Sequence, residues 1–100
     1  MDDVIAELQS TLQDRKRQPS SRSYTSQLLA AGEDEIVKKI GEEAVEVILA
    51  AKGQGDKRLV EESADLVYHL LVLLIARDLT WADVEAELAR RRKPAGQPGD

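Results

Sequence analysis

The chain of 100 residues contains no cysteine and no phenylalanine, and only three of its residues are aromatic. Without cysteine it can form neither a disulfide framework nor a thiolate zinc site, which fits a reducing compartment, and we expect a cytoplasmic location. With so few aromatic residues, its core must be built from leucine, valine, isoleucine and alanine. This composition favours helices over a sheet, so we expect an all-α fold.

Long apolar runs and a basic charge balance are also missing. The longest apolar run, from Leu66 to Ala76, is interrupted by Tyr68 and His69, whereas a membrane span needs about 20 apolar residues. The acidic start lacks the positive flank and apolar stretch of a signal peptide. The net charge of −5 argues against binding to a nucleic-acid backbone. We therefore expect neither a membrane nor a nucleic acid as a partner.

The length fits one domain, which we expect to span residues 1–93 and to be followed by a disordered tail at 94–100. Apolar residues recur at helical spacing and predict a small antiparallel bundle of four to five helices, at about 3–16, 23–31, 33–52, 57–78 and 80–92. The expected N-caps are Asp2 or Asp3 for the first helix, Ser23 or Thr25 for the second, and Thr80 for the fifth, where Asp83 completes a capping box. The turn at 53–56 makes the third and fourth helices antiparallel neighbours.

The fourth predicted helix is apolar around nearly its whole circumference between Leu66 and Ile75. A helix of this kind is buried on all sides. A chain of 100 residues has few helices with which to surround it. We therefore expect a second copy of the chain to cover it in a two-fold homodimer.

Two acidic pairs lie on the neighbouring third and fourth helices: Glu43 with Glu46, and Glu62 with Asp65. Residues three apart on a helix are surface neighbours, so the four carboxylates are expected to converge. Two charges about 4 Å apart repel by about 4 kcal/mol at an effective dielectric of 20. Protonation, lysine or arginine partners, or a divalent cation can relieve this repulsion.

Ligands that offer only oxygen favour Mg²⁺, Mn²⁺ or Ca²⁺. Mg²⁺ usually binds through one or two carboxylates together with substrate phosphates, so a metal here predicts a phosphorylated substrate. Such a cation polarises a phosphoryl oxygen, neutralises a pyrophosphate leaving group and supplies the attacking water. The competing interpretation is that each acidic pair marks an ordinary solvated helix face.

Smaller signals surround the acidic pairs, and each has two interpretations. Lys38 and Lys39 either bind phosphate or pair with glutamates at helical spacing. His69 either supports a metal ligand or is a hydrogen-bonded core histidine. Gly41 either packs closely against a neighbour or clears space for a ligand. Tyr24 is either a core residue with a satisfied hydroxyl or a substrate contact.

Three sequence runs resemble a known family. They are Ser23-Tyr24-Thr25, the run Lys-Lys-Ile-Gly-Glu-Glu-Ala-Val-Glu at 38–46, and the run Glu-Glu-Ser-Ala-Asp-Leu-Val-Tyr-His at 61–69. Together they resemble the phosphoribosyl-ATP pyrophosphatase family of the all-α nucleoside triphosphate pyrophosphohydrolases, over residues 4 to 92. The two acidic pairs are shared across the superfamily and indicate the reaction class, whereas the other residues of these runs point to this family.

The resemblance implies a homodimeric, Mg²⁺-dependent enzyme, in which Mn²⁺ can replace Mg²⁺. It would hydrolyse the α–β phosphate bond of phosphoribosyl-ATP to phosphoribosyl-AMP and pyrophosphate, the second step of histidine biosynthesis. By position, the implied metal ligands are Glu43, Glu46, Glu62 and Asp65. Glu42 and Glu61 would orient ligands or steer the attacking water, so that the expected catalytic residues are Glu42, Glu43, Glu46 and Glu62. The implied substrate contacts are Lys38, Lys39, Ser23 and Tyr24.

Some members of the family carry a fused cyclohydrolase domain, and we expect that activity to be absent here. Two other functions remain open at this point. One is a house-cleaning pyrophosphatase for a noncanonical nucleotide, which a substrate panel would reveal. The other is a helical dimerisation module without catalytic activity, which would show no turnover and no stabilisation by Mg²⁺.

Overall fold

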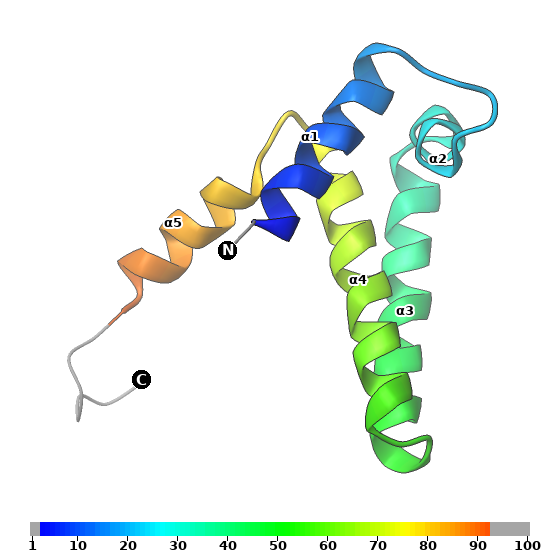
Figure 1. The fold of residues 1–100 in the computed structure, drawn as a ribbon, viewed down its shortest axis with the longest axis vertical. Helices are drawn as coiled ribbons and strands as arrows, with labels where there is room; N and C mark the ends of the chain where they lie inside the picture. Colours follow the sequence, from blue (N-terminus) through cyan, green and yellow to red (C-terminus); the bar gives the residue numbers. More distant parts are fainter. Residues whose placement is uncertain (1–2, 93–100) are drawn as a thin grey trace.

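The computed structural model describes residues 3–92, which form five α-helices and no strand. The helices are α1 (Val4–Arg17), α2 (Tyr24–Ala31), α3 (Glu33–Gly53), α4 (Asp56–Ala76) and α5 (Trp81–Arg90) (Figure 1). The predicted all-α fold is confirmed over this range, and the predicted helix limits agree to within about two residues. The tail predicted at 94–100 lies outside the described residues.

The caps explain why the helices start where they do. The carboxylate of Asp3 accepts the amide N–H of Ala6 at 3.0 Å, and the hydroxyl of Ser23 accepts that of Ser26 at 3.2 Å. Thr80 and Asp83 form a complete capping box at the start of α5. Each of these contacts satisfies a backbone donor that would otherwise have no partner in the first helical turn.

Helices α3 and α4 form an antiparallel hairpin that runs along the long axis of the molecule (Figure 1). Gly55 precedes α4 with a φ of 89°. This left-handed conformation favours glycine, because it is strained for residues with a Cβ atom. The short turn therefore holds the facing surfaces of the two helices together along their length, as the sequence predicts.

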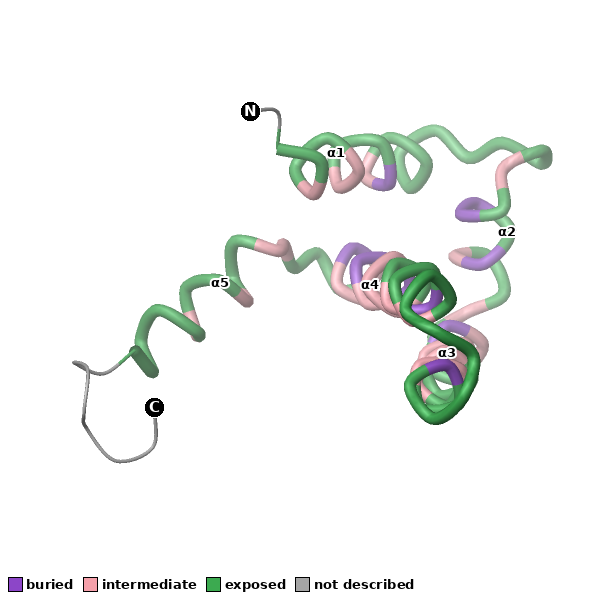
Figure 2. The backbone as a smooth tube through the Cα atoms, turned by 60° about the horizontal axis from the view of Figure 1, so that its bottom comes forward, coloured by how far each residue is buried: buried purple, intermediate pink, exposed green. Residues whose placement is uncertain are grey.

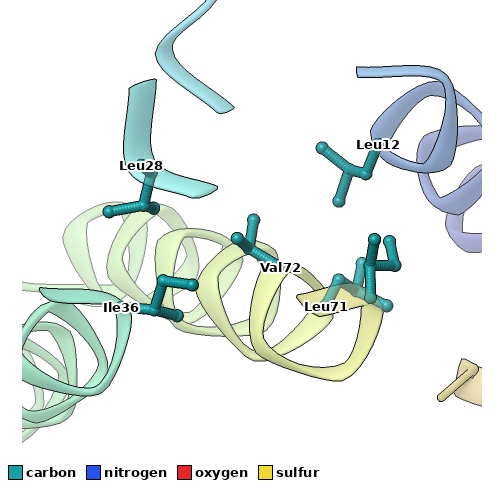
Figure 3. Close-up of a cluster of buried hydrophobic side chains, with 6 residues drawn as sticks. Leu12, Leu28, Ile36, Leu71 and Val72 are labelled. Atoms are coloured by element: carbon teal, nitrogen blue, oxygen red, sulfur yellow. The ribbon is translucent and has the colours of Figure 1, made fainter. Parts of the chain in front are cut away.

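Helices α1 and α2 cover the C-terminal half of α4 and the N-terminal end of α3 (Figure 2). The core lies where these four helices meet, and Figure 3 shows its side chains pointing toward one another. Its buried members are Leu12, Leu28, Ile36, Leu71, Val72 and Ile75. Lys16 secures the same end of α4, because its ammonium group donates to the carbonyl of Ile75 at 3.0 Å and to Asp78 at 2.7 Å.

Within residues 3–92, α4 is buried only in part: Leu71, Val72 and Ile75 are buried, whereas Leu66 and Leu70 are half-buried. That a second copy covers the rest of α4 stays a prediction. The apolar residues of α3 form two faces. Residues such as Ile36 face the rest of the chain, whereas an opposite face is exposed, because one chain supplies helices to cover only one side of α3. Its members are Val37, Val45, Ile48 and Leu49.

Helix α5 extends away from the other helices (Figure 1). None of its residues is buried, but Trp81 at its start packs against the core, and the main-chain N–H of Trp81 donates to the side chain of Gln9 at 2.6 Å. Farther along α5, Leu88 is 60% exposed. The helix is thus attached at its start and uncovered toward its end.

Within residues 3–92, none of the helices combines the length and the hydrophobicity that crossing a membrane requires.

Candidate functional site

Three carboxylates meet at the interface of the α3–α4 hairpin. Glu43 comes from α3, and Glu62 and Asp65 come from α4; one oxygen from each lies within 4.8 Å of the others. The spacing of three residues places both α4 carboxylates on the side that faces Glu43. Glu62 is only 6% exposed, Glu43 is half-buried and Asp65 is exposed. The acidic trio is therefore backed by protein on one side and open to solvent on the other.

The other two predicted catalytic residues of α3 lie outside the acidic trio. Glu46 is half-buried but is not among the three converging carboxylates. At 3.6 residues per turn it lies about 60° around the helix from Glu43, on the side away from the centre of the α4 interface. Glu42 is exposed and pairs with Lys39 at 3.8 Å. The structure thus brings together three of the four carboxylates that were expected to converge.

Arg58 partly neutralises the acidic trio. Its guanidinium group donates to Glu61 at 2.8 Å and also pairs with the buried carboxylate of Glu62. Arg58 lies outside the sequence runs that carry the family resemblance. Its spacing does indicate the contact, because Arg58 precedes Glu61 and Glu62 by three and four residues, the spacing of ion pairs along one helix face.

The surroundings of Glu43 favour its protonated form over its charged form. Burial raises the pKa of Glu43, and its hydrogen bond with Glu62 and the charge of Asp65 raise it again, while His69 lowers it. The chain itself therefore supplies an arginine partner for Glu62 and surroundings that raise the pKa of Glu43.

The raised pKa of Glu43 predicts a pH dependence of stability. In the metal-free chain the folded state keeps this proton at pH values where the unfolded state, with a pKa near 4.5, has lost it. The free energy of unfolding is therefore expected to fall as the pH rises from this value through the raised pKa. Thermal melts with a chelator, followed by circular dichroism, should show this decrease in the wild type and a smaller one in Glu43→Gln. Equal pH profiles for the two proteins would contradict the prediction.

His69 connects the acidic turn of α4 to α2. It is buried, and its Nδ1 donates to the main-chain carbonyl of Asp65 at 2.7 Å, since a carbonyl can only accept. Its Nε2 lies 2.9 Å from the hydroxyl of Tyr24, which donates to it when the ring is neutral. His69 is thus a hydrogen-bonded buried histidine, and it contacts the backbone of Asp65 rather than the carboxylate.

Tyr24 is 47% exposed, so the interpretation as a core residue is wrong, although its hydroxyl has a partner. Burial of the hydroxyl raises the pKa of Tyr24; Tyr68, Glu43 and Glu42 raise it further, and Lys39 lowers it. The hydroxyl therefore stays protonated at neutral pH and lies within electrostatic reach of these groups. Tyr24 is thus an exposed ring whose polar end is directed toward the acidic site.

The other predicted substrate contacts, Lys38, Lys39 and Ser23, differ in where they lie relative to Glu43 and Tyr24. Lys39 lies four residues before Glu43 and shares its side of α3, whereas Lys38 is exposed and lies about 140° away around the helix. Ser23 caps α2 next to Tyr24. A Cβ atom added at Gly41 would meet nothing within 4 Å, so close packing within the chain does not explain this glycine.

Comparison with known proteins matches this chain to one family. Residues 5–92 match the model of the phosphoribosyl-ATP pyrophosphohydrolase family. A phosphoribosyl-ATP pyrophosphatase of Pelotomaculum thermopropionicum is 54% identical over 91 residues, which cover 91% of this chain and 93% of the relative. A protein of the same name from Pyrobaculum calidifontis is 48% identical over 90 residues, covering 90% of this chain and 96% of the relative. A third, from Lactiplantibacillus plantarum, is 48% identical over 87% of this chain and 82% of its own length.

A helical bundle with an acidic trio on a helix hairpin, together with these matches, defines an all-α hydrolase. The chain belongs to the phosphoribosyl-ATP pyrophosphohydrolase family.

Proposed function

We propose that the chain hydrolyses phosphoribosyl-ATP between its α and β phosphates, releasing phosphoribosyl-AMP and pyrophosphate. The observation that carries the proposal is the acidic trio, with oxygens within 4.8 Å of one another, in a chain that is 54% identical to a phosphoribosyl-ATP pyrophosphatase. By the family resemblance, the reaction is the second step of histidine biosynthesis and takes place in the cytoplasm.

The donor set fits a hard divalent cation. All three groups offer carboxylate oxygens, the ligands that Mg²⁺ and Mn²⁺ prefer in proteins. We propose that Glu43, Glu62 and Asp65 hold Mg²⁺. Glu46, although it lies outside the acidic trio, is proposed as a fourth ligand because the family resemblance implies it. When bound, the cation would polarise the phosphoryl group and neutralise the pyrophosphate leaving group.

The surrounding side chains have proposed roles of their own. Arg58 fixes the carboxylates of Glu61 and Glu62 in one orientation, because a guanidinium binds both at once. Lys39, on the same side of α3 as Glu43, would bind substrate phosphate, and Lys38 would reach the substrate from the exposed side. Glu42 and Glu61 would orient the attacking water.

We further propose that the protein works as a two-fold homodimer. Val37, Gly41, Val45 and Ile48 lie on one face of α3, and all four are exposed in the single chain. Because Gly41 has no side chain, a helix of a second copy can approach this face closely. Burial of this face against its symmetry mate would account for the uncovered apolar residues.

The test is an assay of pyrophosphate release by the purified chain with phosphoribosyl-ATP, Mg²⁺ or Mn²⁺, and a panel of other nucleotides. We expect turnover of phosphoribosyl-ATP that a chelator abolishes, and slower release from the other nucleotides. Preference for another nucleotide would favour a house-cleaning pyrophosphatase. Absence of turnover, combined with a melting temperature that Mg²⁺ does not change, would favour a dimerisation module.

A further inference from the structure

A second polar site lies between the end of α1 and the start of α2. It is a surface pocket of about 420 Å³ lined by Arg15, Ser20, Arg22 and Ser23. Two arginines and two serines therefore border one pocket in a chain whose net charge is −5. The pocket includes neither the acidic trio nor its arginine partner.

The walls of this pocket are fixed by hydrogen bonds. The amide N–H of Ser20 donates to the hydroxyl of the buried Ser26 at 3.0 Å, and that hydroxyl donates to the carbonyl of Arg15 at 3.4 Å. The amide N–H of Ser23 donates to the carbonyl of Ser20 at 3.1 Å. The end of α1, the loop and the start of α2 are thus held in one arrangement.

The two arginines have no ion-pair partner within residues 3–92, in contrast to their neighbours. Lys16 pairs with Asp78 and Arg17 pairs with Asp14, but Arg15 and Arg22 pair with no carboxylate in this range. Both arginines line the pocket. Their positive charge is therefore available to a ligand.

Helix electrostatics explains Arg15 but not Arg22. A cation at the C-terminal end of α1 is favoured by the helix dipole. Arg22, however, directly precedes Ser23, the N-cap of α2, where the positive end of the helix disfavours a cation. A cation held there, beside a second arginine, is stabilised when an anion lies between them. Arginine is suited to this role because its planar fork donates two hydrogen bonds to a phosphate.

We infer that this pocket binds a phosphate monoester, namely the phosphate of the substrate's phosphoribosyl group. The inference rests on the proposed function, which gives the substrate a phosphate group apart from its triphosphate. Ser23 lines the pocket, and the adjacent Tyr24 reaches His69, which is bonded to the backbone of Asp65. A continuous set of contacts therefore leads from the pocket, through Tyr24 and His69, to the backbone of the acidic turn of α4. A triphosphate at the trio would leave the second phosphate group for the arginine pocket.

The first test is kinetic and uses the double variant Arg15→Gln/Arg22→Gln. We expect its KM for phosphoribosyl-ATP to rise about tenfold or more, with kcat changed by less than about threefold, because the contact is to a group that does not react. The matched control is Arg90→Gln/Arg91→Gln on α5, which removes the same charge far from the pocket. An unchanged KM in the first variant, or an equal rise in the control, would overturn the inference.

The second test measures binding without turnover. Ribose 5-phosphate is titrated into the metal-free protein, with pyrophosphate as the competing probe. We expect ribose 5-phosphate to bind the wild type and to bind the double variant about tenfold more weakly, whereas pyrophosphate should not compete. Equal binding to both proteins, or competition by pyrophosphate at the arginines, would overturn the inference. If the wild type fails to hydrolyse phosphoribosyl-ATP but still shows this binding pattern, the proposed function fails and the phosphate site stands.

Folding of the variants is checked by thermal melts. Arg22→Gln alone, at an exposed loop position, provides a variant that retains every core contact. We expect this single variant to raise KM and to weaken ribose 5-phosphate binding, each by less than the double variant does. A normal KM together with normal ribose 5-phosphate binding would count against the inference.

Discussion

Replacing Glu62 with glutamine is expected to lower the rate of pyrophosphate release by about a hundredfold or more while the chain stays folded. Glu62 is the most deeply buried member of the acidic trio, at 6% exposure. Glutamine has nearly the same shape, but it removes the negative charge that a cation requires. Its amide oxygen can still accept from Arg58, so the packing of the α3–α4 interface should be retained.

The rate is measured as pyrophosphate release with Mg²⁺ in excess, beside Glu43→Gln and Glu46→Gln. The control is Glu7→Gln, at an exposed position of α1, which should retain the wild-type rate. A second readout is the melting temperature, which Mg²⁺ should raise in the wild type and raise less in Glu62→Gln, since a cation that binds only the folded state stabilises it. Wild-type rates in all three site variants would refute the site assignment.

Replacing Ile48 with glutamate is expected to convert the proposed homodimer to monomers. Ile48 is 59% exposed in the single chain and lies on the same face of α3 as Val45 and Gly41. In a two-fold interface the substitution places a charge in the interface twice. Burying an unpaired carboxylate is costly, so the dissociation constant should rise by about a hundredfold or more.

Analytical ultracentrifugation over a range of protein concentrations measures this effect. The control is Ser10→Glu, which adds the same charge at an exposed position of α1 and should leave the dimer intact. A wild-type chain that sediments as a monomer at all concentrations would disprove the dimer. An unchanged dissociation constant in Ile48→Glu would show that this face of α3 is not the interface.

Much of the fold could be predicted because its determinants are local. Asp3 and Thr80 cap helices through contacts with residues three positions away. Gly55 has a backbone conformation that favours glycine, and the turn to which it belongs makes α3 and α4 neighbours. The pairing of Glu62 with Asp65 follows from helical spacing alone.

The other features depend on which surfaces meet, and local spacing does not determine this. A carboxylate oxygen of Glu43 lies within 4.8 Å of those of Glu62 and Asp65, whereas Glu46, about 60° farther around the helix, is not part of this group. Val37 and Ile48 have the periodicity of a buried face, yet no helix in the described part of the chain covers them. The contact between Tyr24 and His69 joins residues 45 positions apart, and no local pattern indicates it.

The α3–α4 hairpin carries the whole acidic trio, and this affects how the protein acquires its site. Contacts between segments that are close in the chain form faster than contacts that close long loops. The three carboxylates can therefore come together during an early stage of folding, before the docking of α1 and α2 completes the core. The arginine pocket is more local still, because its lining residues lie between positions 15 and 23 and its hydrogen bonds join residues at most 11 positions apart. The acidic trio and the arginine pocket can therefore each form within one continuous segment of the chain, and packing of the core then fixes the position of one relative to the other.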